Sequence, residues 1–132
     1  MDSVFTKIIN GQIPCFKIAE TDKAIAFLDI APLAKGHTLV VPKIQIDKFF
    51  ELPSEDYLSL MTFVKQVANA MAKALPCERI GATVIGLEVP HAHMHLIPIS
   101  TMGDMDFFNP KLKLSPTEME SIAASIKNCL EY

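Results

Sequence analysis

Three histidines at alternate positions are the residues of this chain best suited to chemistry. His91, His93 and His95 are three of the four histidines in 132 residues, and they stand in the run Pro-His-Ala-His-Met-His-Leu-Ile-Pro at positions 90–98. Apolar residues fill the positions between them, which is the period-two pattern of a strand with one buried face. We therefore predict a strand that presents three imidazoles on one face and packs its other face into the core.

Imidazole titrates near neutral pH, so such a row can serve as nucleophile, general base, general acid or metal ligand. Sets of three histidines do bind zinc at catalytic sites. A cupin-like metal site would also require a glutamate a few residues after the second histidine. This sequence has Leu-Ile-Pro-Ile at 96–99 and so supplies none there. The pattern therefore favours catalysis by histidine itself, while a metal-binding protein and a merely histidine-rich strand stay as alternatives.

The rest of the chain must form the elements that position this row. Runs rich in β-formers predict further strands over 16–20, 24–28, 37–41 and 79–85. Cap residues and apolar spacing predict three helices, around 4–9, over 54–75 and from a capping box at 115–118 onward. Short links between strands favour an antiparallel sheet, which we expect to carry its helices on one face. The predicted fold class is α+β, with about five strands in a single domain over residues 1–132.

Composition limits the partners and the compartment. The net charge of -3 gives no reason to expect a nucleic acid polymer as partner, although single nucleotides can bind at a local site. The three cysteines are widely spaced and form no C-x-x-C motif, which is typical of thiols in a reducing compartment. The sequence contains no signal-peptide pattern and no apolar stretch of membrane-spanning length. We therefore predict a cytoplasmic protein that has no membrane partner.

Two polar residues outside the run are further candidates. Asp29 follows the strand at 24–28 and precedes Ile-Ala-Pro, a position where an acid often forms a turn or cap. A carboxylate there can equally accept hydrogen bonds from both hydroxyls of a ribose, although the chemistry alone favours the turn. His37 opens the strand at 37–41, and its interest depends on whether it faces the row of histidines.

At the histidine run the chain resembles the histidine triad (HIT) family of nucleotide hydrolases and transferases, whose signature alternates histidine and hydrophobic residues. His95 stands where the transferase branch carries glutamine, which points to the hydrolases. The passage 27–43 is also very similar to HIT proteins. The opening 4–14 is characteristic of the histidine triad nucleotide-binding (Hint) branch, so the resemblance covers residues 4 to about 99 in three blocks.

This resemblance implies a HIT-like fold, an antiparallel sheet of about five strands with a long middle helix, usually paired into a homodimer through that helix and its neighbouring strand. It implies hydrolysis at the α-phosphate of a purine nucleotide conjugate, such as a phosphoramidate. His93 would be the nucleophile that forms a nucleotidyl-histidine, and its other ring nitrogen then needs an acceptor, commonly a backbone carbonyl. His91, His95 and His37 would supply hydrogen bonds or protons around the phosphate. No cofactor is required on this interpretation, and incidental zinc at the histidine cluster stays open.

The resemblance also places Asp29 on the ribose hydroxyls, which raises it from a turn former to a ligand. An apolar slot for the base would be formed by Val4, Phe5, Ile8, Phe27, Leu28, Ile30 and Leu39. Gly86, Glu88 and Val89, in the loop before the triad, would complete the nucleotide-binding set.

This loop is also where the chain departs from the family. Hint proteins usually have a Gly-Gln-Ser-like stretch whose polar groups touch the phosphate, whereas positions 86–88 read Gly-Leu-Glu, and the usual asparagine on the preceding strand is absent. A carboxylate near a phosphate costs energy unless it is neutralised. Glu88 either points to solvent or faces the leaving group and favours a cationic one. Alternatives are a nucleotide-binding scaffold with little turnover and a dinucleoside polyphosphate hydrolase.

Overall fold

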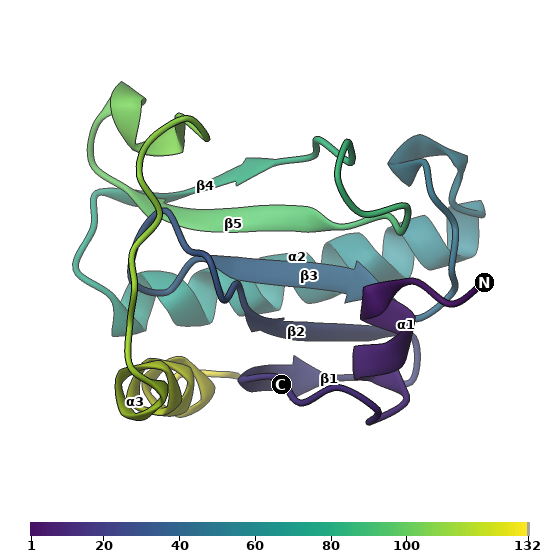
Figure 1. Ribbon diagram of the computed structural model, residues 1–132, viewed down its shortest axis with the longest axis horizontal. Coiled ribbons are helices and arrows are strands. Elements are labelled where there is room, and N and C mark those ends of the chain that lie inside the picture. Colours follow the sequence, from purple (N-terminus) through teal and green to yellow (C-terminus); the bar gives the residue numbers. More distant parts are fainter. Residues whose placement is uncertain (132) are drawn as a thin grey trace.

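A five-stranded antiparallel sheet forms the centre of the computed structural model, which describes residues 1–131 (Figure 1). The strand order is β1-β2-β3-β5-β4. The strands are β1 (Lys17–Glu20), β2 (Ala24–Leu28), β3 (Thr38–Pro42), β4 (Arg79–Thr83) and β5 (Met94–Ile99). The predicted α+β class and the five antiparallel strands are therefore confirmed.

The register of the sheet places one histidine at its centre. Phe27 lies opposite Leu39, and Leu39 lies opposite His95 on β5. Directly opposite residues of adjacent strands share a face of the sheet, so these three side chains form a row across it. We call this side of the sheet the histidine face.

β5 is shorter than the predicted strand at 90–98. Its pairing with β3 begins at Met94, so His91 and His93 precede the ladder. The amide of Ala92 donates instead to the carbonyl of Ile46, at 2.7 Å, and the amide of His91 closes a turn on Val89. The residues that lead into β5 are therefore hydrogen-bonded outside the sheet. β4 likewise ends at Thr83, before the predicted end at 85.

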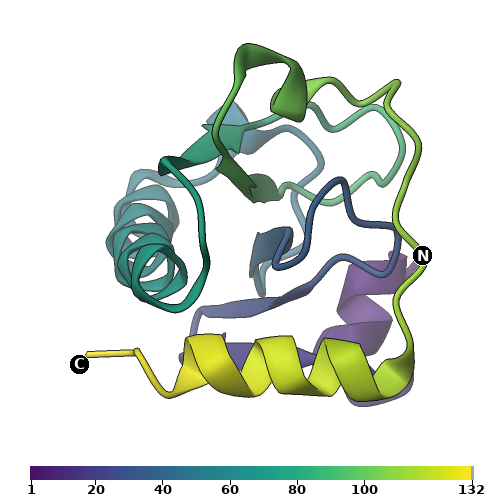
Figure 2. The same ribbon diagram turned by 90° about the vertical axis from the view of Figure 1, so that its left-hand side faces the viewer.

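The helices lie on both faces, contrary to the prediction of one. α2 (Ser54–Ala74) and α3 (Pro116–Lys127) pack on the side opposite the histidines, whereas α1 (Val4–Ile9) packs on the histidine face (Figures 1 and 2). Both faces of β2 are buried, because all five of its residues are inaccessible to solvent. A strand buried on both faces needs cover on both, and α1 supplies the second layer.

Alternation along β2 assigns each side chain to one core. Ile25 and Phe27 pack with Phe5 of α1, whereas Ala26 and Leu28 belong to the core under α2 and α3. The side chain of Leu28 therefore lies on the opposite face from the histidines. The prediction that Leu28 lines the slot for the base is therefore wrong for its side chain.

After β5 the chain passes through a short 3₁₀ helix, η2 (Met102–Met105), and then crosses the histidine face on its way to α3. Figures 1 and 2 show this crossing in light green, on the same side of the sheet as α1 and opposite α2. We call residues 106–113 the covering segment. The capping box predicted at the start of α3 is present, with Ser115 and Glu118 each bonding the backbone of the other. No helix within residues 1–131 is long and apolar enough to cross a membrane.

Candidate active site

All four histidines meet on the histidine face and are nearly inaccessible to solvent. Their exposed fractions are 1% for His37, 0% for His91, 6% for His93 and 9% for His95. His37 Nε2 lies 3.0 Å from His95 Nδ1, and the rings of His93 and His95 lie 5.0 Å apart between centroids. His37 therefore faces the row, which settles the question that the sequence left open.

The ring of His93 is held in one tautomer. Its Nδ1 lies 2.7 Å from the backbone carbonyl of His91, and a carbonyl oxygen can only accept a hydrogen bond. Nδ1 of the neutral ring must therefore carry the proton, which leaves the lone pair on Nε2. Phe5 packs edge-on against this ring at 4.9 Å and limits its rotation. The expected carbonyl partner is thus present, and it makes His93 Nε2 available as a nucleophile.

A chain of hydrogen bonds fixes the opposite tautomer on His95. The backbone N–H of Leu33 donates to His37 Nδ1 at 3.0 Å, so the proton of neutral His37 must be on Nε2. That Nε2–H then donates to His95 Nδ1. His95 in turn carries its proton on Nε2, and this N–H is a hydrogen-bond donor on the ring that neighbours His93.

Burial keeps this chain uncharged near neutral pH. It lowers the pKa of His37 to about 3, with smaller contributions from the charges of His95 and Lys111. Burial likewise lowers the pKa of His95 to about 4, helped by the neighbouring His93. Both rings therefore act as neutral hydrogen-bond donors and acceptors, because protonation of either would break the Leu33–His37–His95 chain.

His91 has a structural position rather than a chemical one. Its Nε2 donates to the carbonyl of Pro42 at 2.7 Å, and its Nδ1 accepts from Ser3 Oγ at 2.7 Å. Since both nitrogens are bonded within the protein, none is free to reach a phosphate. The expectation that His91 supplies hydrogen bonds or protons to the substrate is contradicted by this geometry. The residue instead ties the N-cap of α1 to the end of β3.

Asp29 forms a turn and keeps one oxygen for other partners. Its Oδ1 accepts from the backbone N–H of Ala31 at 2.9 Å, while Oδ2 lies 3.6 Å from His37 Nε2. Burial raises the pKa of this carboxyl, and Glu88 adds to the rise, whereas the Ala31 N–H, His93 and Lys111 oppose it. The turn role and the ribose role are therefore compatible, since the turn uses only one of the two oxygens.

Asp29, His37 and His95 also bring potential metal-ligand atoms within 4.8 Å of one another. The donor chemistry does not fit a metal, however. His37 Nδ1 accepts from Leu33, so His37 Nε2 holds a proton and has no lone pair to offer. Metal binding there would require an imidazolate or a broken backbone hydrogen bond.

An apolar cluster beside His93 corresponds to the expected slot for the base. Phe5, Phe27 and Leu39 form its buried part, with Ile8 packed against them. Val4 is 41% and Ile30 80% exposed, so both lie at the surface rather than in the cluster. The structure adds two buried members that the sequence did not single out, Ile25 and Val41. Alternation along β2 and β3 places Ile25 on the same face as Phe27, and Val41 on the same face as Leu39, so this pattern could have identified both residues from the sequence.

Comparison with known proteins agrees with this geometry. The HIT domain family model matches residues 10–102, which include every strand of the sheet. The chain belongs to the HIT domain family.

Relatives over the whole chain include enzymes. The adenosine 5'-monophosphoramidase hnt1 of Schizosaccharomyces pombe is 35% identical over 130 residues, which cover 97% of this chain and 98% of that protein. The adenylylsulfatase HINT3 of Arabidopsis thaliana is 29% identical, over 98% of this chain and 68% of that protein. A Hit-like protein from Bartonella henselae has the same fold, with a TM-score of 0.85 and 28% identity over 98% of this chain and 96% of its own. We describe the chain as a HIT-type hydrolase.

The loop before the triad lies at the edge of this HIT site. Gly86 has a φ of +74°, a left-handed conformation that favours glycine and turns the chain after β4. Val89 packs against the cluster around Phe5, while Leu87 is 88% exposed. Glu88 is exposed, and its charge raises the pKa of Asp29.

The covering segment contributes residues that the sequence did not single out. The ring of Phe107 lies 4.9 Å from that of His95 and 6.1 Å from that of His37, edge-on to both. The backbone N–H of Leu112 donates to the carbonyl of Pro32 at 2.8 Å and attaches the segment to the loop after Asp29. Sequence spacing offered no signal for these contacts, because the segment has no periodic pattern.

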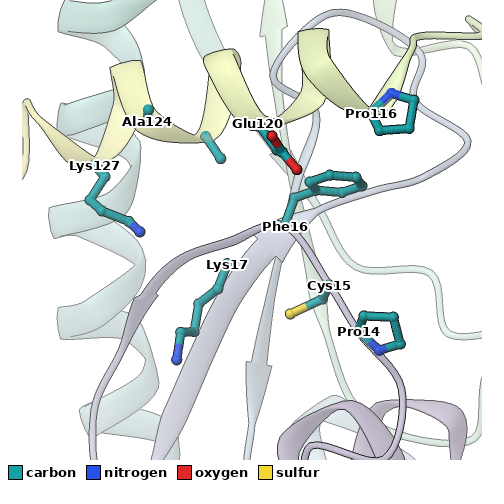
Figure 3. Close-up of a pocket in the computed structure, with 9 residues that line it drawn as sticks. Pro14, Cys15, Phe16, Lys17, Pro116, Glu120, Ala124 and Lys127 are labelled. Carbon is teal, nitrogen blue, oxygen red and sulfur yellow. The ribbon is translucent and has the colours of Figure 1, made fainter.

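A separate groove of about 580 Å³ lies away from the HIT site, between the chain entering β1 and helix α3 (Figure 3). Cys15 and Lys17 line it on one side, and Glu120 and Lys127 on the other. Burial raises the pKa of the Cys15 thiol, which therefore stays protonated and weakly nucleophilic. The four histidines, by contrast, all lie at the histidine face.

Proposed function

We propose that this HIT protein hydrolyses the bond at the α-phosphate of a nucleoside phosphoramidate or a related conjugate of a purine nucleotide, and so releases a nucleoside monophosphate. The observation that carries the proposal is the 2.7 Å hydrogen bond from His93 Nδ1 to the His91 carbonyl. It leaves an unprotonated Nε2 beside an apolar cluster that suits a base and a carboxylate that suits a ribose.

The proposed reaction has two steps. His93 Nε2 attacks the α-phosphorus, the bond from phosphorus to the leaving group breaks, and a nucleotidyl-histidine forms, while a departing amine takes up a proton from the solvent. Water then attacks the same phosphorus, the bond to His93 breaks, the surplus proton of the water returns to the solvent, and the nucleotide leaves. In both steps the Nε2–H of His95 donates to a phosphoryl oxygen, where negative charge accumulates in the transition state.

The names of two relatives suggest the substrate class. One is called an adenosine 5'-monophosphoramidase and another an adenylylsulfatase, and both names describe cleavage next to an adenylyl phosphate. The leaving groups differ, so the substrate of this chain is best tested as a set. A role for Glu88 in the choice of leaving group stays a prediction.

The deciding experiment is a turnover panel of adenosine 5'-phosphoramidate, adenosine 5'-phosphosulfate and a dinucleoside polyphosphate, followed by chromatography of the products. We expect adenosine monophosphate from the phosphoramidate. Rapid quenching and intact-mass measurement should then detect the adenylylated protein. Tight nucleotide binding without any product would favour the scaffold alternative instead.

We also propose that the protein is a homodimer, which pairs through β4 and α2. β4 is an edge strand of the sheet, and Leu58 on α2 is 64% exposed. Edge strands and exposed apolar side chains are commonly covered by a partner. Sedimentation of the protein as a monomer at micromolar concentration would contradict this proposal.

The single domain, the cytoplasmic location and the absence of a required cofactor stay predictions. All three cysteines are free, which agrees with a reducing compartment.

A further inference from the structure

The covering segment places a lysine next to the histidine site. Phe107 packs against His37 and His95, and Leu112 bonds the loop that follows Asp29. Figures 1 and 2 show that this part of the chain runs over the histidine face. Lys111 lies between these two attachment points, so its position relative to the site is held from both sides.

Three of the four histidines do not provide a cation for the site. Burial lowers the pKa of His37, His91 and His95, so all three are neutral near pH 7. The loop at 86–88 brings the carboxylate of Glu88 instead of polar phosphate contacts. The phosphate of a nucleotide is an anion, and an anion in a partly buried site is costly unless a positive group lies near it.

The ammonium group of Lys111 is held in place by the backbone of the covering segment. Its Nζ donates to the carbonyls of Phe107 and Asn109, the latter at 3.1 Å. An ammonium group has three donors, so one N–H remains for a ligand while two hold the group in place. The charge also reaches the site, because Lys111 lowers the pKa of both Asp29 and His37.

We propose that Lys111 binds the phosphate of the nucleotide, and so replaces the polar contacts that the Gly-Leu-Glu loop lacks. This inference rests on the proposed function, because it requires a nucleotide at the histidine site. It assigns recognition of the phosphate to a segment that follows the triad in sequence and lies over it in space.

The test compares two ligands that differ only in the phosphate. Calorimetry gives the dissociation constants of adenosine and of adenosine monophosphate for the wild type, Lys111→Gln, Lys111→Arg and Lys113→Gln. Lys113 is an exposed lysine two residues further on, and serves as the matched control. We expect the preference for the monophosphate over adenosine to fall about tenfold in Lys111→Gln, the scale of one charge-assisted hydrogen bond. This preference should change by less than about threefold in Lys111→Arg and in Lys113→Gln. In Lys111→Gln the preference should also depend less on salt than in the wild type.

The opposite results are equally clear. An unchanged preference in Lys111→Gln, with or without a lower melting temperature, would show that Lys111 only orders its own loop. An equal fall in Lys113→Gln would show a general surface charge effect and overturn the assignment. If the wild type binds the monophosphate but turns over no conjugate, the proposed hydrolysis fails while the Lys111 result stands. If it binds neither ligand, both proposals fail.

Discussion

At the scale of residues, the chemistry depends on which nitrogen of each ring carries the proton. A backbone carbonyl sets this for His93, and a backbone amide sets it for His37 and, through His37, for His95. Backbone groups cannot change their role as donor or acceptor, so the pattern of tautomers is built into the fold. Substitutions at these positions should therefore affect chemistry and binding separately.

The first such substitution is His93→Ala. Because it removes the attacking lone pair but no ground-state contact to the ribose or base, turnover should be abolished while nucleotide affinity stays within about tenfold. Single-turnover kinetics and calorimetry on the same preparation measure the two quantities. Activity retained in the variant would exclude His93 as the nucleophile.

Asp29 requires a pair of variants, since its Oδ1 also forms the turn with Ala31. Asp29→Ala should weaken ribonucleotide binding by about 1.5–3 kcal/mol, the scale of hydrogen bonds to a charged group. Asp29→Asn keeps an oxygen for the turn but loses the charge, so it should lower affinity with little change in melting temperature. A nucleotide that has neither ribose hydroxyl should bind the wild type, Asp29→Ala and Asp29→Asn almost equally. Equal losses for both ligands would leave Asp29 as a turn former only.

At the scale of elements, the histidine face is assembled by contacts between segments that are distant in sequence. The N-cap residue of α1, Ser3, reaches His91, and His91 reaches the end of β3 at Pro42. α1 then brings Phe5 against His93. A six-residue helix is too short to be stable alone, so its position depends on these tertiary contacts.

His91→Ala tests this connection. The variant leaves the Pro42 carbonyl without its partner and removes a buried ring, so we expect a loss of stability of about 2 kcal/mol or more. Ser3→Ala removes only the cap and one bond to His91, and should cost about 1 kcal/mol. Urea unfolding measures both. If instead His91→Ala keeps full stability and loses only turnover, the ring has a chemical role that its hydrogen bonds do not reveal.

At the scale of the whole molecule, the free energy of unfolding should depend on pH through the buried histidines. The pKa values of His37 and His95 fall from 6.5 in the unfolded chain to about 3 and about 4 in the folded protein. As pH decreases through 6.5, the unfolded chain therefore binds protons that the folded protein does not. Stability is complete above this pH and is lost progressively toward pH 4 and below.

Urea unfolding from about pH 7.5 to about pH 4.5 measures this loss. Each histidine contributes a slope of up to about 1.4 kcal/mol per pH unit. His37→Gln lacks one of the two groups, so its stability should be lower at neutral pH but should depend less steeply on pH. Parallel curves for the variant and the wild type would contradict the lowered pKa of His37.

The sequence alone determined much of this protein. Alternating residues predicted the histidine row and a strand there, although β5 itself begins only at Met94. β-rich runs predicted the other strands, and the capping box at Ser115 marked the start of α3. Such features depend on neighbours along the chain, where the periods of strands and helices are visible. The HIT resemblance, carried by these same local motifs, agrees with the family match over residues 10–102.

Only the tertiary structure decided how the histidines divide their roles. His91 and His93 stand two residues apart and look equivalent in sequence, yet one has both nitrogens bonded in the protein and the other has a free one. The placement of α1 on the histidine face, and of Phe107 and Lys111 over the site, depended likewise on segments distant in sequence. The physical reason is that hydrogen-bond partners and burial are properties of the folded chain, whereas spacing is a property of the sequence.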